Sequence, residues 1–156
     1  VVNGDDKKKM HFFPVSKAYR VNARFEPVKE VKWFSMETSG SVRKTFRVYG
    51  YIHFAIHDTL VKLAIYQSQN LIQQDEYKNH LFLPFTDLTS GESSYTAGRY
   101  IDLQTTDIVN NAVTIDFNKA YNPYCAYVSG KYNCPVPPRE NQLMVTIPAG
   151  EMNYTK

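Results

Sequence analysis

The sequence lacks long apolar runs and the motifs of the commonest enzyme classes. Arg, Lys, His or Asp interrupts every hydrophobic stretch before it reaches the roughly 18 to 20 residues of a membrane helix. The patterns G-x-x-x-x-G-K-[ST], G-x-G-x-x-G, G-x-S-x-G and H-E-x-x-H are all absent. These absences count against a transmembrane helix, the common nucleotide-dependent enzymes, serine hydrolases and zinc proteases. Nothing in the sequence implies a cofactor or a metal.

Clustered positive charge is also scarce. The run Lys7 to Lys9 follows Asp5 and Asp6 in a segment without core-forming residues. So short and mixed a run predicts a solvated tail over residues 1–10 and no nucleic-acid partner. The start VVNGDDKKK is typical of the stretch that follows an export signal, which predicts an exported protein, periplasmic or surface-anchored. A trimmed cytosolic chain would begin in the same way.

Aromatic residues, in contrast, are abundant. The 156 residues are 43% hydrophobic and 21% charged, which suits a single domain over residues 11–156 with one ordinary core. The 12 Tyr and 9 Phe favour strands over helices. In TFRVYGYIHFAI a period of two places one set of apolar side chains on a single face: Phe46, Val48, Ile52, Phe54 and Ile56. The polar pair His57 and Asp58, followed by TLVKLAIYQ, predicts a β-hairpin.

The rest of the chain also indicates strands. Short candidates bounded by turn formers lie at 18–26, 80–85, 99–103, 112–117 and 143–147. Only QSQNLIQQDEYKNH suggests a short helix or turn. Seven or eight strands without helices between them predict a mostly β fold, an antiparallel barrel or sandwich with little helix. Two long polar loops, Thr86–Gly98 and Asn118–Asn141, interrupt it.

The second loop is about 24 residues long, so it is either functional or held by its own contacts. It contains the two cysteines, Cys125 and Cys134, among turn-forming Pro and Gly residues. A disulfide between them would stabilise the fold by roughly 2.5 to 3 kcal/mol in an oxidising compartment. Two free thiols remain an alternative. A metal site is disfavoured because structural zinc needs four ligands and no His lies near in sequence.

Arg99 is the most informative polar residue. It shares a face with Ile101 and Leu103, which predicts that it points inward. A buried guanidinium needs a partner, so we expect a carboxylate within hydrogen-bonding reach. The candidates are Asp87, Glu92 and Asp116. Such a pair could be purely structural or could belong to an anion site.

Asp116 and Asn118 emerge on the same side of a strand end. They could cap the following turn through their side chains, or they could bind a ligand. Asp87 and Glu92 flank Gly91 in a pattern that also matches turn and cap chemistry.

Two long stretches resemble a known family. LFLPFTDLTSGESSYTAGRYIDL and VTIDFNKAYNPYCAYVSGKYNCPVPPRENQLMVTIPAGE are similar to the bacterial and archaeal family known as domain of unknown function 1684. The resemblance covers most of the chain and rests on GRY, DFN, AYNPYCAY, CP-PP-EN and AGE. It implies no activity and no catalytic residues. The shared residues are mainly polar, aromatic and loop-borne, which favours recognition of a ligand slightly over an internal hydrogen-bonded network.

The leading hypothesis is therefore a β-domain that binds a small polar or anionic ligand. Its candidate residues are Arg99, Asp87, Glu92, Asp116, Asn118, Tyr121, Asn122, Glu140 and Asn141. One alternative is a hydrolase or transferase in which Asp116 or Glu92 is the general base and Arg99 stabilises negative charge. Another is an accessory module that binds a protein through an exposed aromatic patch. The sequence predicts no oligomeric state.

Overall fold

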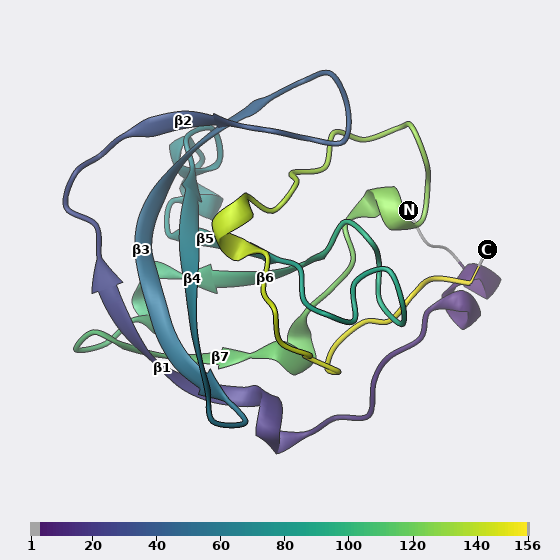
Figure 1. Ribbon diagram of the computed structural model, residues 1–156. Helices are drawn as coiled ribbons and strands as arrows, with labels where there is room; N and C mark the ends of the chain where they lie inside the picture. The colour runs from purple at the N-terminus through teal and green to yellow at the C-terminus, as the bar shows by residue number, and fades with distance from the viewer. Residues whose placement is uncertain (1–3, 156) are drawn as a thin grey trace.

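The computed structural model describes residues 4–155, which form one curved, antiparallel sheet (Figure 1). The strands in this part of the chain are β1 (Arg20–Pro27), β2 (Trp33–Met36), β3 (Lys44–Ile56), β4 (Thr59–Ser68), β5 (His80–Phe85), β6 (Arg99–Gln104) and β7 (Ala112–Asp116). The sheet has the order β6-β5-β4-β3-β1-β7, and β2 pairs with the first residues of β3. The predicted antiparallel β fold is confirmed, and the sheet is an open half-barrel.

Helical structure within residues 4–155 is confined to short 3-10 turns. They are Gly4–Lys9, Lys17–Tyr19, Leu71–Gln73, Asp75–Tyr77, Thr105–Asp107, Phe117–Lys119, Tyr124–Ala126 and Arg139–Asn141. The first of them is exposed and lies in the expected tail, of which residues 1–3 are outside the described residues. None of the described helices is long and apolar enough to cross a membrane.

The hairpin of β3 and β4 confirms its prediction. His57 and Asp58 both have positive φ, 45° and 69°, as the two central residues of a type I′ turn do. The strands predicted near 18–26, 80–85, 99–103 and 112–117 are also present.

Strand β3 differs from the prediction at one place. The pairing with β4 shifts between Val48 and Gly50, where a bulge adds one residue. An added residue reverses the alternation of side chains, so Phe46 lies on the opposite face from Ile52 and Phe54. The expectation that these residues share one face was wrong.

The bulge divides the apolar residues between two clusters. The larger one covers the first face of the sheet and contains Leu63, Leu81, Phe85, Ile115 and their neighbours. The smaller one lies on what we call the second face, and its members are Met36, Phe46, Ala64, Tyr66, Phe82 and Tyr100.

The strand expected at 143–147 does not form. Its backbone bonds instead to the irregular segment after β5: Leu143 N donates to Thr86 O (2.8 Å), and Leu88 N donates to Val145 O (2.8 Å). The structure has β2 (Trp33–Met36) instead, a four-residue strand that we did not predict because it is too short to show a period.

The C-terminal segment closes the fold. It runs back past the N-terminal segment, where Phe13 N donates to Gly150 O (2.9 Å) and Met152 N donates to His11 O (2.7 Å). Figure 1 shows this yellow segment beside the purple N-terminal turn.

Candidate functional site

Arg99 lies in the interior of the protein, and its side chain has no exposed surface. Its Nη2 donates to Asp87 Oδ1 (3.3 Å) and to the carbonyl of Ile147 (3.0 Å). Its Nη1 donates to the carbonyls of Ala149 and Glu151. The prediction that an inward Arg99 finds a carboxylate partner is confirmed, with Asp87 as that partner. Burial lowers the pKa of Arg99, and the charge of Asp87 opposes this change.

The local backbone explains how Arg99 reaches this position. Gly98 has φ +97°, and a Cβ there would lie 2.4 Å from the Phe85 carbonyl oxygen. Only glycine fits that close approach without strain. Asp87 is fixed as well, because its Oδ2 accepts hydrogen bonds from Ile147 N (2.7 Å) and Thr89 N (3.3 Å).

Asp116 and Asn118 act as a cap. Asp116 Oδ1 accepts from the backbone N of Asn118 (3.0 Å) and from its Nδ2 (2.9 Å). The Asn118 amide in turn pairs with both backbone groups of Ser16, at 3.0 and 2.8 Å. These contacts attach the segment before β1 to the end of β7.

Asn141 is buried between β4 and β5. Its Oδ1 accepts from Ala64 N (2.9 Å), and its Nδ2 donates to Ala64 O (2.9 Å) and Pro84 O (2.8 Å). Strands β4 and β5 pair only at Tyr66 and Phe82, so the Asn141 amide substitutes for ladder bonds where the two strands diverge.

Asn122 is held by the C-terminal segment. Its backbone N donates to Oε1 of the buried Glu151 (2.9 Å), and its Nδ2 donates to the carbonyl of Met152 (3.0 Å). Glu151 also accepts a hydrogen bond from the hydroxyl of Tyr127. Glu92 is exposed, and its carbonyl accepts from Asn153 Nδ2 (2.7 Å).

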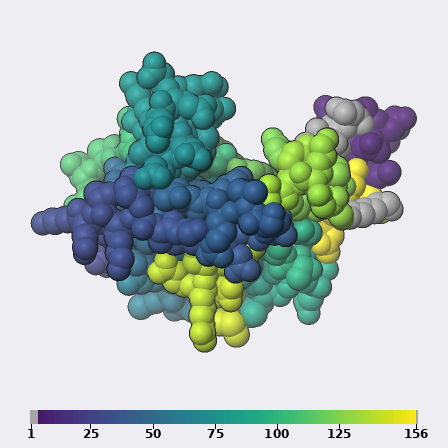
Figure 2. All heavy atoms as spheres, turned by 90° about the horizontal axis from the view of Figure 1, so that it is seen from above, coloured from purple at the N-terminus to yellow at the C-terminus, as the bar shows by residue number. Residues whose placement is uncertain are grey.

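A hollow of about 760 Å³ lies elsewhere, on the second face. Phe46, Phe82 and Tyr100 form its floor. Figure 2 shows it between the projection of residues 70–78 (teal) and the lobe of residues 124–133 (yellow-green). We call it the aromatic groove, and its lining is Val42, Arg43, Lys44, Thr45, Phe46, Ser68, Asn70, Leu71, Tyr77, His80, Phe82, Tyr100, Asp102, Tyr121, Asn122, Pro123, Tyr124, Tyr132, Asn133, Cys134 and Pro135.

The floor of the aromatic groove is a continuous series of rings. Phe46 stacks on Phe82 with centroids 5.6 Å apart, and Phe82 meets Tyr100 edge to face at 4.7 Å. Tyr100 in turn meets Tyr121 edge to face at 5.8 Å. These separations are typical of attractive aromatic pairs, so the rings hold each other in place without a ligand.

Three polar side chains meet at the β6 side of this floor. His80 Nε2 lies 3.1 Å from Asp102 Oδ1, and the Tyr121 hydroxyl donates to the same carboxylate at 2.9 Å. Burial raises the pKa of Tyr121, and the charge of Asp102 raises it further, so the hydroxyl remains protonated and a donor. The Asp102 side chain is 49% exposed, which leaves it accessible from the aromatic groove.

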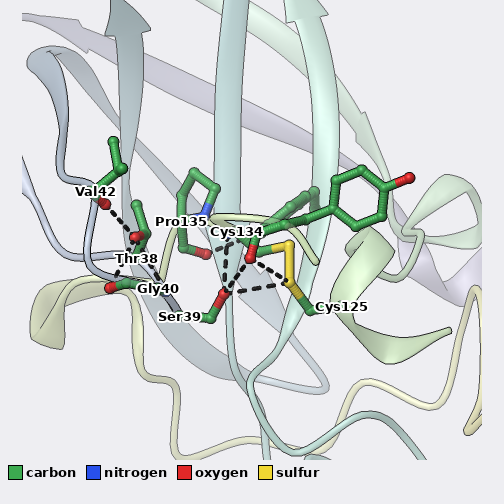
Figure 3. The surroundings of a disulfide bond; sticks show 9 residues. Thr38, Ser39, Gly40, Val42, Cys125, Cys134 and Pro135 are labelled. Carbon is green, nitrogen blue, oxygen red and sulfur yellow. Dashed lines mark hydrogen bonds between the residues drawn. A yellow bond between two sulfur atoms is a disulfide. The ribbon is translucent and has the colours of Figure 1, made fainter. Parts of the chain in front are cut away.

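The cysteines form a disulfide beside the aromatic groove (Figure 3). The free-thiol alternative is therefore not what the structure has. Ser39 fixes the loop from the other side: its Oγ donates to Tyr132 O (3.2 Å) and accepts from Cys134 N (3.1 Å). The rings of Tyr124 and Tyr132, 5.2 Å apart, thereby become one wall of the groove.

A second, smaller hollow of about 390 Å³ contains Glu140. Glu140 Oε1 accepts from the hydroxyl of Tyr66 (2.6 Å). Burial, followed by this hydrogen bond, raises the pKa of Tyr66. Within residues 4–155, no three His, Cys, Asp or Glu side chains gather as a metal site would require.

The family model described as "Protein of unknown function (DUF1684)" matches residues 6–152. The chain belongs to the DUF1684 family. The DUF1684 chain is also similar to the solution NMR structure of an uncharacterized protein from Haloarcula marismortui, with a TM-score of 0.72 and 30% sequence identity over 92% of this chain and 75% of that one. No curated protein is similar to it in sequence. The resemblance seen in the sequence is thus confirmed, and it brings no assigned activity.

The predicted site residues of this DUF1684 protein do not converge on one cavity. Tyr121 and Asn122 line the aromatic groove, and Glu140 lines the smaller hollow. Neither Asp116 nor Glu92 bonds to Arg99 among the described contacts, and the carboxylate that pairs with Arg99 is that of Asp87.

The polar end of the groove is formed in part by His80 and Asp102, which the sequence analysis did not select. The period of two in HLFLPF and RYIDL could have identified them. In the β5–β6 register Phe82 lies opposite Asp102, on the face that is not occupied by Leu81 and Leu83. A strand face that combines aromatic and ionisable residues is a signal for a site.

Proposed function

We propose that this protein binds a small, planar, anionic molecule in the aromatic groove. The observation that carries the proposal is a continuous aromatic floor, from Phe46 to Tyr121, bordered by basic residues at one side. A volume of about 760 Å³ is within the range of small-molecule sites, which are mainly apolar with a few placed polar groups. The ligand-binding hypothesis from the sequence is kept, and its site moves from Arg99 to the groove.

The basic side favours an anion. Arg43 is held in place through Ser35, to whose Oγ and backbone O it donates at 2.8 and 2.7 Å. Lys44 forms no ion pair with any carboxylate in the described part of the chain. A preorganised guanidinium beside an unpaired ammonium attracts carboxylate, sulfonate or phosphate groups.

The apolar lining favours a flat ring. Exposed aromatic side chains, such as Tyr124 at 56% and Tyr121 at 36%, border a floor that is itself aromatic. A planar ligand can make offset or edge-to-face contacts with several of these rings at once.

Titration with 2-naphthalenesulfonate, a planar ring system with one anionic group, tests the proposal. We expect saturable binding by calorimetry, with NMR shifts confined to residues of the groove. Lys44→Ala should weaken binding at least fivefold, since it removes a cation without disturbing the core. Lys119→Ala, an exposed lysine outside the lining, is the matched control and should bind as the wild type does.

Two results would contradict the proposal. One is the absence of saturable binding by the folded protein. The other is equal affinity of the wild type, Lys44→Ala and Tyr124→Ala, which would place any binding outside the groove.

A further inference from the structure

The two sides of the aromatic groove differ in chemical character. At the β3 side, Arg43 and Lys44 are hydrogen-bond donors with positive charge. At the β6 side, Asp102 and the Tyr121 hydroxyl offer acceptor oxygens. We infer that the ligand is a mononucleotide: a base whose N–H edge meets Asp102 and a phosphate that meets Arg43 and Lys44. This inference rests on the proposed function, because it concerns the same groove.

Asp102 retains capacity to accept hydrogen bonds. A carboxylate has about four acceptor positions, and the described contacts to Asp102 come from His80 and Tyr121. Both contacts orient the carboxylate, and its 49% exposure leaves the other positions accessible. A simple aromatic acid has no donor for them, whereas the amino and ring N–H groups of nucleobases do.

The separation of the two sides requires an elongated ligand. Between β3 and β6 lie β4 and β5, so at least three strand spacings of about 4.8 Å each separate Lys44 from Asp102 across the sheet. A single aromatic ring cannot contact both residues. A base, a sugar and a phosphate in line can, because the sugar places the charge away from the ring.

The middle of the groove suits a base. The buried rings of Phe82 and Tyr100 lie at the floor, and the exposed ring of Tyr124, beside Tyr132, forms a wall on which a base can stack. Base stacking on aromatic side chains is tolerant of sequence and needs only an accessible ring. The missing glycine-rich motifs are consistent with this mode, because side chains rather than a backbone loop would hold the phosphate.

The test is calorimetric titration of the whole protein with AMP, GMP, CMP and UMP, each compared with its own nucleoside, with inorganic phosphate and with 2-naphthalenesulfonate. At least one nucleotide should bind, tenfold or more tightly than its nucleoside and with no detectable binding of phosphate alone. Asp102→Asn should weaken the nucleotide at least fivefold without weakening 2-naphthalenesulfonate, because the sulfonate has no N–H donor and the variant removes a negative charge from the groove. Asp58→Asn, in the β3–β4 turn where Asn is well tolerated, is the control and should change neither.

The outcomes separate the two proposals. If 2-naphthalenesulfonate binds in the groove and no nucleotide does, the mononucleotide inference is overturned and the proposed function stands. If neither binds, both fail. If a nucleotide binds with the same affinity to Asp102→Asn and wild type, its base does not meet Asp102 and the inference is overturned. Unchanged melting temperatures would establish that each variant is folded.

Discussion

Arg99 and Asp87 form an ion pair in which neither side chain is exposed to solvent, with Nη2 3.3 Å from Oδ1. Burying two charges is expensive, and three backbone carbonyls of the C-terminal segment accept further hydrogen bonds from Nη1 and Nη2 of the guanidinium. The pair therefore does more than balance charge. It determines where residues 147–151 lie against the sheet.

Replacing Arg99 should be severely destabilising. Arg99→Ala leaves the Asp87 carboxylate buried without its cation, so we expect the free energy of unfolding to fall by about 3 to 5 kcal/mol. Urea denaturation followed by circular dichroism measures this. Arg20→Ala, at an exposed position of β1, should change it by less than about 0.5 kcal/mol. A loss below about 1 kcal/mol for Arg99→Ala would show that the pair is dispensable.

Asn141 should stabilise the fold because its side chain forms hydrogen bonds with buried backbone groups. Asn141→Ala leaves backbone groups of Ala64 and Pro84 unpaired in the interior, at about 1 to 3 kcal/mol for each buried group. We expect the free energy of unfolding, measured by chemical denaturation, to fall by at least about 2 kcal/mol. Backbone amides of β4 and β5 should also exchange faster with solvent hydrogen. Gln142→Ala, one residue later and exposed, is the control. Equal stability of the two variants would contradict the role assigned to the amide.

The disulfide should matter for stability and for the groove. The Cys125→Ser/Cys134→Ser double variant should lose roughly 2.5 to 3 kcal/mol, the chain-entropy value for a loop of this length. Because Tyr124 and Tyr132 depend on the loop, its affinity for 2-naphthalenesulfonate should fall as well. Thermal denaturation of the oxidised wild type and the double variant tests the change in stability, and calorimetric titration of both proteins tests the change in affinity. Unchanged affinity would mean that the loop holds its shape without the bond.

The raised pKa values of buried tyrosines predict how the stability of the fold changes at high pH. Burial raises the pKa of Tyr66, Tyr100, Tyr121 and Tyr127 above the usual value of about 10. The folded protein then keeps protons that the unfolded chain releases, so the stabilisation is fully present below about pH 10 and declines as the pH rises beyond it.

Absorbance at 295 nm during an alkaline titration measures this effect. A normal group of tyrosines should ionise near pH 10, and a second group should ionise only together with the loss of the far-ultraviolet circular dichroism signal. A single titration of all 12 tyrosines while the fold is intact would contradict the prediction.

Local patterns were sufficient for much of the fold. Alternation predicted β4, flanking turn formers predicted β5 and β6, the His57–Asp58 turn predicted the hairpin, and the cost of a buried charge led to the pairing of Arg99 with a carboxylate. The bulge after Val48 left no such signal, because an added residue in a run of apolar and aromatic residues leaves the alternation looking intact.

The candidate site was harder to predict. Polar residues in irregular loops were selected as candidates for binding. In the structure, Asp116, Asn118 and Asn141 instead form hydrogen bonds with backbone groups whose positions depend on the tertiary fold. The aromatic groove depends on segments far apart in sequence, such as Lys44, Asp102 and Tyr132. Their proximity follows from the strand order, which no local pattern specifies.

The partners of Arg99 also set a time order for biosynthesis. Its acceptors at Ile147, Ala149 and Glu151 are translated 48 to 52 residues later. At about 5 to 20 residues per second, the guanidinium must stay hydrated for roughly 2 to 10 seconds before the ribosome supplies them. The nascent β-hairpin can form during that interval, but the interior cannot be sealed, so the protein completes its fold only after residue 151 has emerged.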